Sequence, residues 1–273
     1  MTSNLPTLAF IGGGNMASAI IGGLIRQGIQ TDKLLVIEPF EETRQRLQTE
    51  FGVQAQAHAD STLQQAGLVV WAVKPQIFKE AAGPVQAHTT KALHLSVAAG
   101  IRSDSIAEWL GSERVVRCMP NTPALVGCGM TGLFARAAVQ EADKALVNQV
   151  LQATGQLMWV DKEPLLDAVT ALSGSGPAYV YYFIEAMTEA GVQMGLSADQ
   201  AKNLAVTTFK GAAELAGSST ESPEVLRQRV TSKGGTTYAA LTSMEESHIK
   251  PHFMAALEKA RARAVELGDE FGA

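Results

Sequence analysis

The chemistry in this chain is first indicated by three consecutive glycines that follow its first apolar run. They stand in a G-x-G-x-x-A pattern directly after the predicted strand 8–12. In such a strand-to-helix turn, glycine allows a tight bend and the close approach of a pyrophosphate, which lies at the helix N-terminus. The pattern predicts a dinucleotide site, although glycine-rich turns that serve only packing have the same composition. The residues assigned to the turn are Gly12, Gly13, Gly14, Asn15, Met16 and Ala17.

An acidic residue, Glu38, ends the second predicted strand, 21 positions beyond Ala17. An acid at this point accepts hydrogen bonds from the adenosine ribose hydroxyls and repels a 2′-phosphate, which favours NADH. Arg44 and Arg46 follow on a predicted helix, where they could reach a phosphate or lie solvated. The residues therefore leave the choice between NADH and NADPH open.

A basic residue and a proline follow a third apolar run, in the segment Ala72, Val73, Lys74 and Pro75. Open parallel sheets bind ligands at the carboxyl ends of their strands, and this segment is expected at that edge. Lys74 is then either a ligand contact or an ordinary solvated lysine. The residues do not decide between the two.

A second glycine pair precedes two threonines near the end of the chain, in Gly234, Gly235, Thr236 and Thr237. An apolar helical stretch begins at Tyr238, so backbone N–H groups and the helix dipole could hold a carboxylate there without a charged side chain. The hydroxyl of Thr237 could hydrogen-bond a ring nitrogen and orient it. An ordinary helix start uses the same residue types.

These segments need a scaffold, and the pattern of residues 7–160 predicts one. Short aliphatic runs alternate with helix-period segments, which is typical of β-α units in a parallel sheet covered on both faces. After Lys162 the strand signals stop and helix starts follow, at Ser197 with Gln200 and at Ser222 with Pro223. We expect an α/β Rossmann-type domain, residues 1–162, and an all-helical domain, residues 163–273. The predicted strands are 8–12, 34–38, 68–73, 93–97, 115–119, 131–134 and 156–160, and predicted helices include 16–27, 41–51 and 140–153.

One helical segment is apolar almost all round. Residues 168–196 contain only two charged residues, Glu185 and Glu189. A domain of about 110 residues could hardly bury such a helix alone. We therefore expect it to be wrapped by a second subunit in a homodimer, which could assemble further; the alternative is a core helix within one chain.

Composition excludes several classes of function. A net charge of −5 without a basic cluster argues against a nucleic-acid partner. Two cysteines, Cys118 and Cys128, make no disulfide framework, and no metal is expected because His248 and His252 are separated by Pro251 outside any H-E-x-x-H context. No apolar run reaches the length of a membrane span, and the N-terminus lacks the pattern of a signal peptide. A soluble cytoplasmic protein is expected.

Three further motifs suggest a family. They are Arg117–Pro123 (RCMPNTP), Leu172–Tyr179 (LSGSGPAY) and Ser232–Thr237 (SKGGTT). With the glycine turn they resemble pyrroline-5-carboxylate reductase over almost the whole length of the chain. The resemblance implies a Rossmann domain joined to a helical dimerisation domain. It also implies NADPH- or NADH-dependent reduction of the cyclic imine Δ1-pyrroline-5-carboxylate to L-proline, the last step of proline biosynthesis.

The resemblance also implies roles for matching positions. It places the glycine turn, Ala72–Pro75, Ala98, Ala99 and Gly100 against the dinucleotide. It places Glu163, Ser232, Gly234, Gly235, Thr236 and Thr237 beside the substrate, with Thr237 as the residue that polarises and orients the imine. Two positions depart from the family: Lys233 stands where proline is usual, and Ala59 where an asparagine often contacts the ribose.

Three alternatives remain from the residues alone. A β-hydroxyacid dehydrogenase also pairs a Rossmann domain with a helical half, but uses a lysine with an asparagine four residues later. Here Asn203 is the only asparagine after residue 160, and Asp199 precedes it by four. Another imine reductase is the second alternative. The third, a non-catalytic dinucleotide-binding redox sensor, would fit the glycine turn but does not require the Gly-Gly-Thr-Thr segment.

Overall fold

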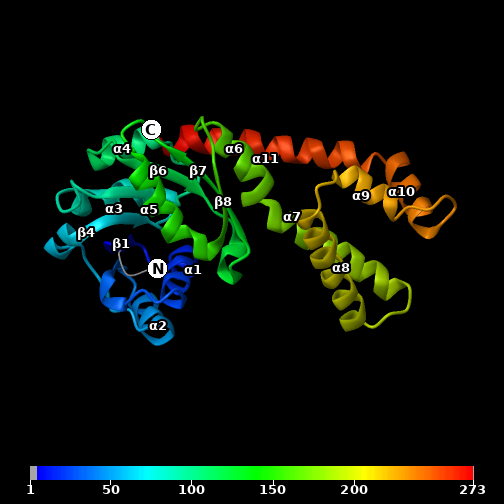
Figure 1. Cartoon of the computed structure of the whole chain (residues 1–273), viewed down its shortest axis with the longest axis horizontal. Coiled ribbons are helices and arrows are strands. Elements are labelled where there is room, and N and C mark those ends of the chain that lie inside the picture. The colour runs from blue at the N-terminus through cyan, green and yellow to red at the C-terminus, as the bar shows by residue number, and fades with distance from the viewer. Residues whose placement is uncertain (1–4, 273) are drawn as a thin grey trace. The chain divides into compact units, whose positions relative to one another are not determined.

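The computed structural model describes residues 5–272, which fold into two compact units. The sheet unit contains the chain up to Gly174 and again from Ala260, and the helical unit contains Ser175–Lys259 (Figure 1). The last turns of the C-terminal helix thus belong to the sheet unit. The compact units divide the chain after Gly174 and after Lys259. The domain boundary predicted after Lys162 stays a prediction.

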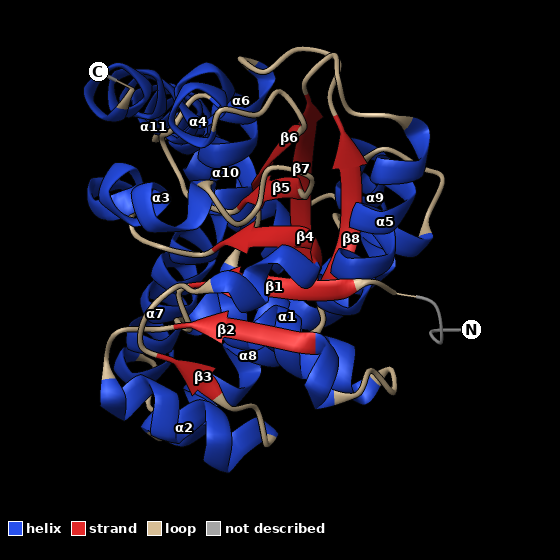
Figure 2. Ribbon diagram, turned by 90° about the vertical axis from the view of Figure 1, so that its left-hand side faces the viewer, coloured by secondary structure: helices blue, strands red, loops and turns tan. Residues whose placement is uncertain are grey.

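The sheet unit is built on one eight-stranded sheet with the strand order β3-β2-β1-β4-β5-β6-β7-β8 (Figure 2). All neighbouring strands run parallel except β6 and β7, which are antiparallel. Their link, residues 120–128, is shorter than the dozen or so residues that a parallel crossover requires. The strands are β1 (Thr7–Ile11), β2 (Leu34–Ile37), β3 (Ala55–Gln56), β4 (Ala66–Trp71), β5 (Leu93–Ser96), β6 (Val115–Met119), β7 (Gly129–Ala135) and β8 (Gly155–Trp159).

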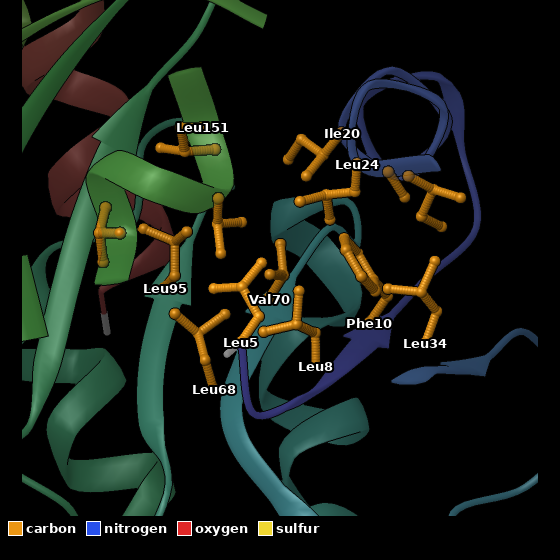
Figure 3. Close-up of a cluster of buried hydrophobic side chains, with 14 of the residues drawn as sticks. Leu5, Leu8, Phe10, Ile20, Leu24, Leu34, Leu68, Val70, Leu95 and Leu151 are labelled. Atoms are coloured by element: carbon orange, nitrogen blue, oxygen red, sulfur yellow. The ribbon is translucent and has the colours of Figure 1, made fainter. Parts of the chain in front are cut away.

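Helices cover both faces of this sheet, as its almost continuously apolar strands require. One core lies under α1 (Asn15–Arg26), α2 (Glu41–Phe51) and α5 (Glu141–Leu151). In Figure 3, Ile20 and Leu24 of α1 point toward Phe10 and Val70 of the strands. The second core lies under α3 (Phe78–Gln86) and α4 (Ser103–Leu110), where Trp71 stacks on Phe78 with ring centroids 4.8 Å apart.

Local sequence explains where these helices begin and end. Gln140 and Asp143 form a reciprocal capping box at the start of α5. The helix α2 has acidic residues in its first turn and stops at Gly52, which adopts the left-handed conformation with φ 70°. The predicted helix 41–51 and strand 115–119 coincide with α2 and β6, and the other predicted strands fall within a few residues of the observed ones. The two-residue strand β3 was not predicted.

The helical unit confirms that helices follow the sheet, because the described chain after Trp159 contains no strand. The Ser197–Gln200 capping box is formed at the start of α8, and the Ser222 side chain caps α9 by accepting from Val225. The short helix α6 (Leu165–Val169) and a π-helical turn, Thr170–Gly174, precede the helical unit. Its helices are α7 (Gly176–Gln193), α8 (Ala198–Ser218), α9 (Pro223–Arg229), α10 (Thr236–Glu246) and α11 (Ile249–Phe271), of which α11 continues into the sheet unit.

The apolar helix α7 is only partly covered by its own chain. Tyr179 and Phe183 pack edge-on against Phe253 of α11, with ring centroids 5.7 and 5.8 Å apart. Tyr181 and Tyr182 are 62% and 68% exposed. Its own unit therefore does not bury α7 as a core helix. Within residues 5–272, no helix is both long and apolar enough to cross a membrane.

Candidate functional site

The glycine turn joins β1 to α1 and is shaped by close contacts that exclude side chains. Gly12 has φ +94°, and a Cβ there would lie 2.6 Å from the carbonyl oxygen of Ala72. A Cβ on Gly13 would lie 2.7 Å from Leu47 Cδ1. A Cβ on Gly14, by contrast, would meet nothing within 4 Å. The turn therefore has the tight backbone and the open front that a pyrophosphate requires.

The first turn of α1 complements this open front. Gly14 is its N-cap residue, and no acidic side chain lies in its first turn. Unpaired backbone N–H groups and the positive end of the helix dipole are thus presented to an incoming anion. Ala17 is fully buried, as the close packing of helix and strand demands. The residues Gly12 to Ala17 fit a dinucleotide, and their contact with it stays a prediction.

Glu38 lies just after β2 and is held in place by backbone donors. Its Oε2 accepts from the Gly13 N–H at 2.8 Å and its Oε1 from the Phe40 N–H at 2.9 Å. The residue is only 6% exposed. The acid predicted to face the ribose is therefore fixed against the glycine turn.

The two downstream arginines are not simply solvated. Arg44 donates from Nη1 to the carbonyl oxygens of Glu38 and Pro39, at 3.0 and 2.6 Å. Arg46 donates from Nη2 to the Gly13 carbonyl oxygen at 3.0 Å. Both arginines thus brace the backbone around Glu38 and the glycine turn.

A cavity of about 420 Å³ opens beside this turn, between the β2–α2 loop and α3. Its wall is mainly apolar, which suits the flat face of a base. Ala59 lies in the wall. The lining residues are Ile11, Gly12, Ile37, Pro39, Phe40, Ala57, His58, Ala59, Val73, Ile77, Glu80, Ala81, Pro84 and Val85.

Two more loops reach the same edge of the sheet, because β1, β4 and β5 are neighbouring parallel strands. Ala72 follows β4 and donates to the Ile11 carbonyl oxygen at 2.8 Å, which ties its loop to the glycine turn. Lys74 is exposed, and Pro75 begins a short 3-10 helix, Pro75–Ile77. The structure brings Ala72–Pro75 and the glycine turn together, as predicted.

The loop after β5 holds Ala98, Ala99 and Gly100. The Ala98 N–H donates to the Ser96 hydroxyl at 3.3 Å, and Gly100 has φ +71°. A Cβ on Gly100 would lie 3.0 Å from Leu267 and 3.1 Å from Phe271, both on the last turns of α11. The end of α11 therefore packs directly on this loop within the sheet unit.

Glu163 lies at the centre of a polar network in the sheet unit. Its carboxylate accepts from the Ser103 N–H at 2.7 Å, from the Ser103 hydroxyl, and from Arg117 Nη1 at 2.9 Å. The Arg117 side chain is only 6% exposed. Ser103 and Arg117 were not assigned a role from the sequence, although RCMPNTP contains Arg117. The network fixes Glu163 close to the β5–α4 loop, while its contact with substrate stays a prediction.

Two of the motif segments meet through Asn121. Its Nδ2 donates to the Ser173 carbonyl and hydroxyl oxygens at 3.2 and 3.1 Å, and its Oδ1 accepts from the Met130 N–H at 3.0 Å. Ser173 belongs to the π-helical turn before α7. Such turns are frequent at functional sites. Asn121 thus holds the motif Leu172–Tyr179 to the loop after β6.

The Gly-Gly-Thr-Thr segment lies in the helical unit, where Thr236 and Thr237 are the first two residues of α10. Gly234 has φ +74°, and the Gly235 N–H donates to the Ser232 carbonyl oxygen at 3.0 Å, which closes the turn. Gly235 is the N-cap residue, without a side-chain cap. No side chain caps the first turn of α10, and Thr237 is half-buried. The contact of this turn with a carboxylate stays a prediction.

Comparison with known proteins agrees with this geometry. Residues 163–267 match the family model described as pyrroline-5-carboxylate reductase dimerisation, and residues 7–100 match the one described as NADP oxidoreductase, coenzyme F420-dependent. The pyrroline-5-carboxylate reductase of Pseudomonas aeruginosa is 43% identical, with 98% of each chain covered. That of Pisum sativum is 38% identical, with 96% of each covered.

Solved structures give the same result. The pyrroline-5-carboxylate reductase of Coxiella burnetii superimposes with a TM-score of 0.89 at 38% identity, covering 97% of this chain and 99% of that one. The Plasmodium falciparum enzyme, solved with NADP bound, gives 0.86 at 32% identity, covering 96% and 98%. These relatives exclude the β-hydroxyacid dehydrogenase alternative. The chain belongs to the pyrroline-5-carboxylate reductase family.

Proposed function

We propose that this protein reduces Δ1-pyrroline-5-carboxylate to L-proline with NADH or NADPH, the final step of proline biosynthesis. The observation that carries the proposal is the combination, in one family member, of an open glycine turn before α1 and a Gly-Gly-Thr-Thr helix start at α10. The first suits a pyrophosphate and the second a carboxylate. A redox sensor would need only the first.

The first group of residues binds the cofactor in this proposal. The N-terminus of α1 holds the pyrophosphate, the cavity beside Phe40 holds the adenosine, and the loops Ala72–Pro75 and Ala98–Gly100 lie along the nicotinamide half. The bound dinucleotide supplies a hydride. The protein contributes alignment, which is the main requirement because a protonated cyclic imine is already electrophilic.

The second group binds the substrate. Backbone N–H groups at the start of α10 hold its carboxylate, while the Gly235 N–H closes the turn onto the Ser232 carbonyl oxygen. The Thr237 hydroxyl hydrogen-bonds the ring nitrogen and keeps the imine carbon oriented. Glu163 is the substrate contact proposed for the sheet unit, and Arg117 and Ser103 hold its carboxylate. Lys233, exposed in the turn, does not remove any of these donors.

We further propose that the protein acts in the cytoplasm as a homodimer, which could assemble further. The exposed tyrosines of α7 lie within the segment matching the dimerisation family. A second copy of the chain would cover them, because large apolar surfaces left open by one chain mark association sites.

The test is the oxidation of NADH and of NADPH by the purified protein with pyrroline-5-carboxylate, followed by the absorbance of the reduced nicotinamide. A simple 2-oxo acid is the control substrate. We expect rapid oxidation with the imine alone and formation of proline. The absence of turnover with either cofactor would contradict the proposed activity and leave a dinucleotide-binding protein.

A further inference from the structure

We propose that the cofactor site of this chain selects NADH over NADPH, and that Glu38 makes the selection. The inference deepens the proposed function because it rests on the dinucleotide site, but it does not depend on which imine is reduced. The presence of an acid at this position does not by itself set the preference. Its carboxylate could point away from the ribose, or an arginine side chain could lie there instead. The contacts around Glu38 decide between these cases.

The carboxylate of Glu38 cannot turn away without losing two hydrogen bonds. The Gly13 N–H at 2.8 Å and the Phe40 N–H at 2.9 Å each hold one of its oxygens. Every carboxylate oxygen has two acceptor positions, so one position on each oxygen is left for another donor. The ribose 2′- and 3′-hydroxyls can fill these positions, whereas a 2′-phosphate brings further negative charge and acceptor oxygens to the same place.

Glu38 also lies where the adenosine half of the cofactor would be bound. Its chain neighbours Ile37 and Pro39 line the cavity, together with Gly12 and Phe40. A base in this apolar cavity and a pyrophosphate on Gly14 would place the ribose that joins them beside Glu38. The fixed carboxylate would thus face the hydroxyls of this ribose.

The two arginines that follow Glu38 in the chain both donate hydrogen bonds to backbone carbonyl oxygens. Arg44 donates to the carbonyl oxygens of Glu38 and Pro39, and Arg46 to that of Gly13. Each guanidinium has further N–H donors, but these carbonyl oxygens hold it against the backbone, so a 2′-phosphate would have to approach it in that fixed position and beside the Glu38 carboxylate. Among the described residues lining the cavity there is no lysine or arginine, and the titratable ones are His58 and Glu80.

A binding experiment tests the inference without any imine. The purified full-length protein is titrated calorimetrically with NAD⁺ and with NADP⁺, two ligands that differ only in the 2′-phosphate. We expect NAD⁺ to bind at least about tenfold more tightly, and the same preference in kcat/KM for the reduced forms. Equal affinity, or tighter binding of NADP⁺, would overturn the proposal even if the imine is reduced. A preference for NAD⁺ without imine turnover would instead remove only the proposed activity.

Two matched variants identify the residue responsible. Glu38→Gln removes the charge and keeps the shape of the side chain, and Glu42→Gln removes one charge from the exposed first turn of α2. The first should lower the NAD⁺ to NADP⁺ affinity ratio at least about tenfold, and the second should leave it within about twofold. Equal effects of the two variants would show that the general charge of the loop, and not Glu38, sets the preference.

A third variant covers the case in which Glu38→Gln does not fold. Arg44→Ala removes the guanidinium that is bonded to the Glu38 carbonyl oxygen but leaves the carboxylate. If Arg44 held a 2′-phosphate, this change would weaken NADP⁺ binding alone. We expect both affinities to change by the same factor, because Arg44 supports only the backbone. A selective loss of NADP⁺ affinity would contradict the proposal.

Discussion

The sheet unit and the helical unit differ in where they place their large apolar side chains. In the sheet unit Phe10, Trp71 and Phe78 are completely buried between sheet and helices. In the helical unit Tyr182 is 68% and Met194 82% exposed, and its buried residues are small, such as Ala201 and Ala205. Burial of apolar surface is the main favourable contribution to folding. The sheet unit therefore buries its large apolar side chains within one chain, whereas the helical unit leaves several of them exposed.

The largest effect is expected from a charge on the exposed face of α7. Tyr182→Glu would bury a carboxylate in the proposed dimer interface, which costs several kcal/mol unless it is paired. We expect the dimer dissociation constant to rise by about a thousandfold or more, corresponding to about 4 kcal/mol. Sedimentation velocity on a concentration series measures it. Tyr182→Phe keeps the ring and should still form dimers; a dimeric Tyr182→Glu protein would show that this face is not the interface.

The next largest effect is expected in the glycine turn of the sheet unit. Gly12→Ala places a methyl group 2.6 Å from the Ala72 carbonyl oxygen at a φ of +94°. Strain at such a position costs about 3 kcal/mol of unfolding free energy. Chemical denaturation checks the value, and the affinity for the dinucleotide should fall with it. Gly211→Ala in α8 is the control, since no atom of another element lies within 4 Å of that Cβ and no proline follows, so this helical change should be neutral or slightly stabilising. Equal stability of the two variants would remove the steric explanation.

The same difference between the units explains what could be predicted from sequence. The alternation of apolar runs with helix-period segments depends on local burial, so the strands and helices around the glycine turn were predicted within a few residues. β3 was missed because two residues, Ala55 and Gln56, give no periodicity. The helical unit was predicted from the loss of strand signals after Lys162 and from helix starts such as Ser197 with Gln200. The excess of apolar residues in α7 led only to the prediction of a dimer, because a sequence indicates apolar surface but not the position of a partner.

Site residues follow a similar rule. The glycine turn is a local motif, and Glu38 stands at a fixed distance from it, so both could be identified by spacing. The hydrogen bonds of Glu163 join it to Ser103, 60 positions away, and to Arg117, 46 positions away. No local pattern links residues at such separations. The hydrogen bonds from Arg44 and Arg46 to carbonyl oxygens could not be predicted either, because they depend on the path of the β2–α2 loop.

A smaller effect is expected from the buried histidine of the sheet unit. Burial, with the nearby Arg114 guanidinium, lowers the pKa of His94 to about 4. Below its unfolded pKa near 6.5 the unfolded chain takes up a proton that the folded chain refuses, so stability falls as the pH decreases toward 4. Between about pH 7 and about pH 5 this group should account for a loss of about 2 kcal/mol.

Denaturant unfolding at both pH values tests this dependence. His94 accepts a hydrogen bond from Trp71 Nε1 at 3.2 Å, so His94→Gln retains an acceptor while removing the titration. The variant should lose less stability on acidification than the unmodified protein. His58→Gln, at an exposed histidine of the same unit, should show the unmodified pH dependence. An unchanged slope in His94→Gln would mean that other groups govern the acid response.

The smallest effect, and the one confined to the helical unit, is expected at Thr237. Thr237→Ala deletes one hydroxyl at the second residue of α10, where the backbone is already fixed by Gly234 and Gly235. The unfolding free energy should hardly change. The loss of one orienting hydrogen bond should lower kcat/KM for the imine about tenfold, or about 1.4 kcal/mol. Thr237→Ser restores the hydroxyl and should recover most of the activity. If Thr237→Ala turned over normally, the hydroxyl would have no part in orienting the imine, and only the backbone of the α10 N-terminus would remain as the substrate contact of this unit.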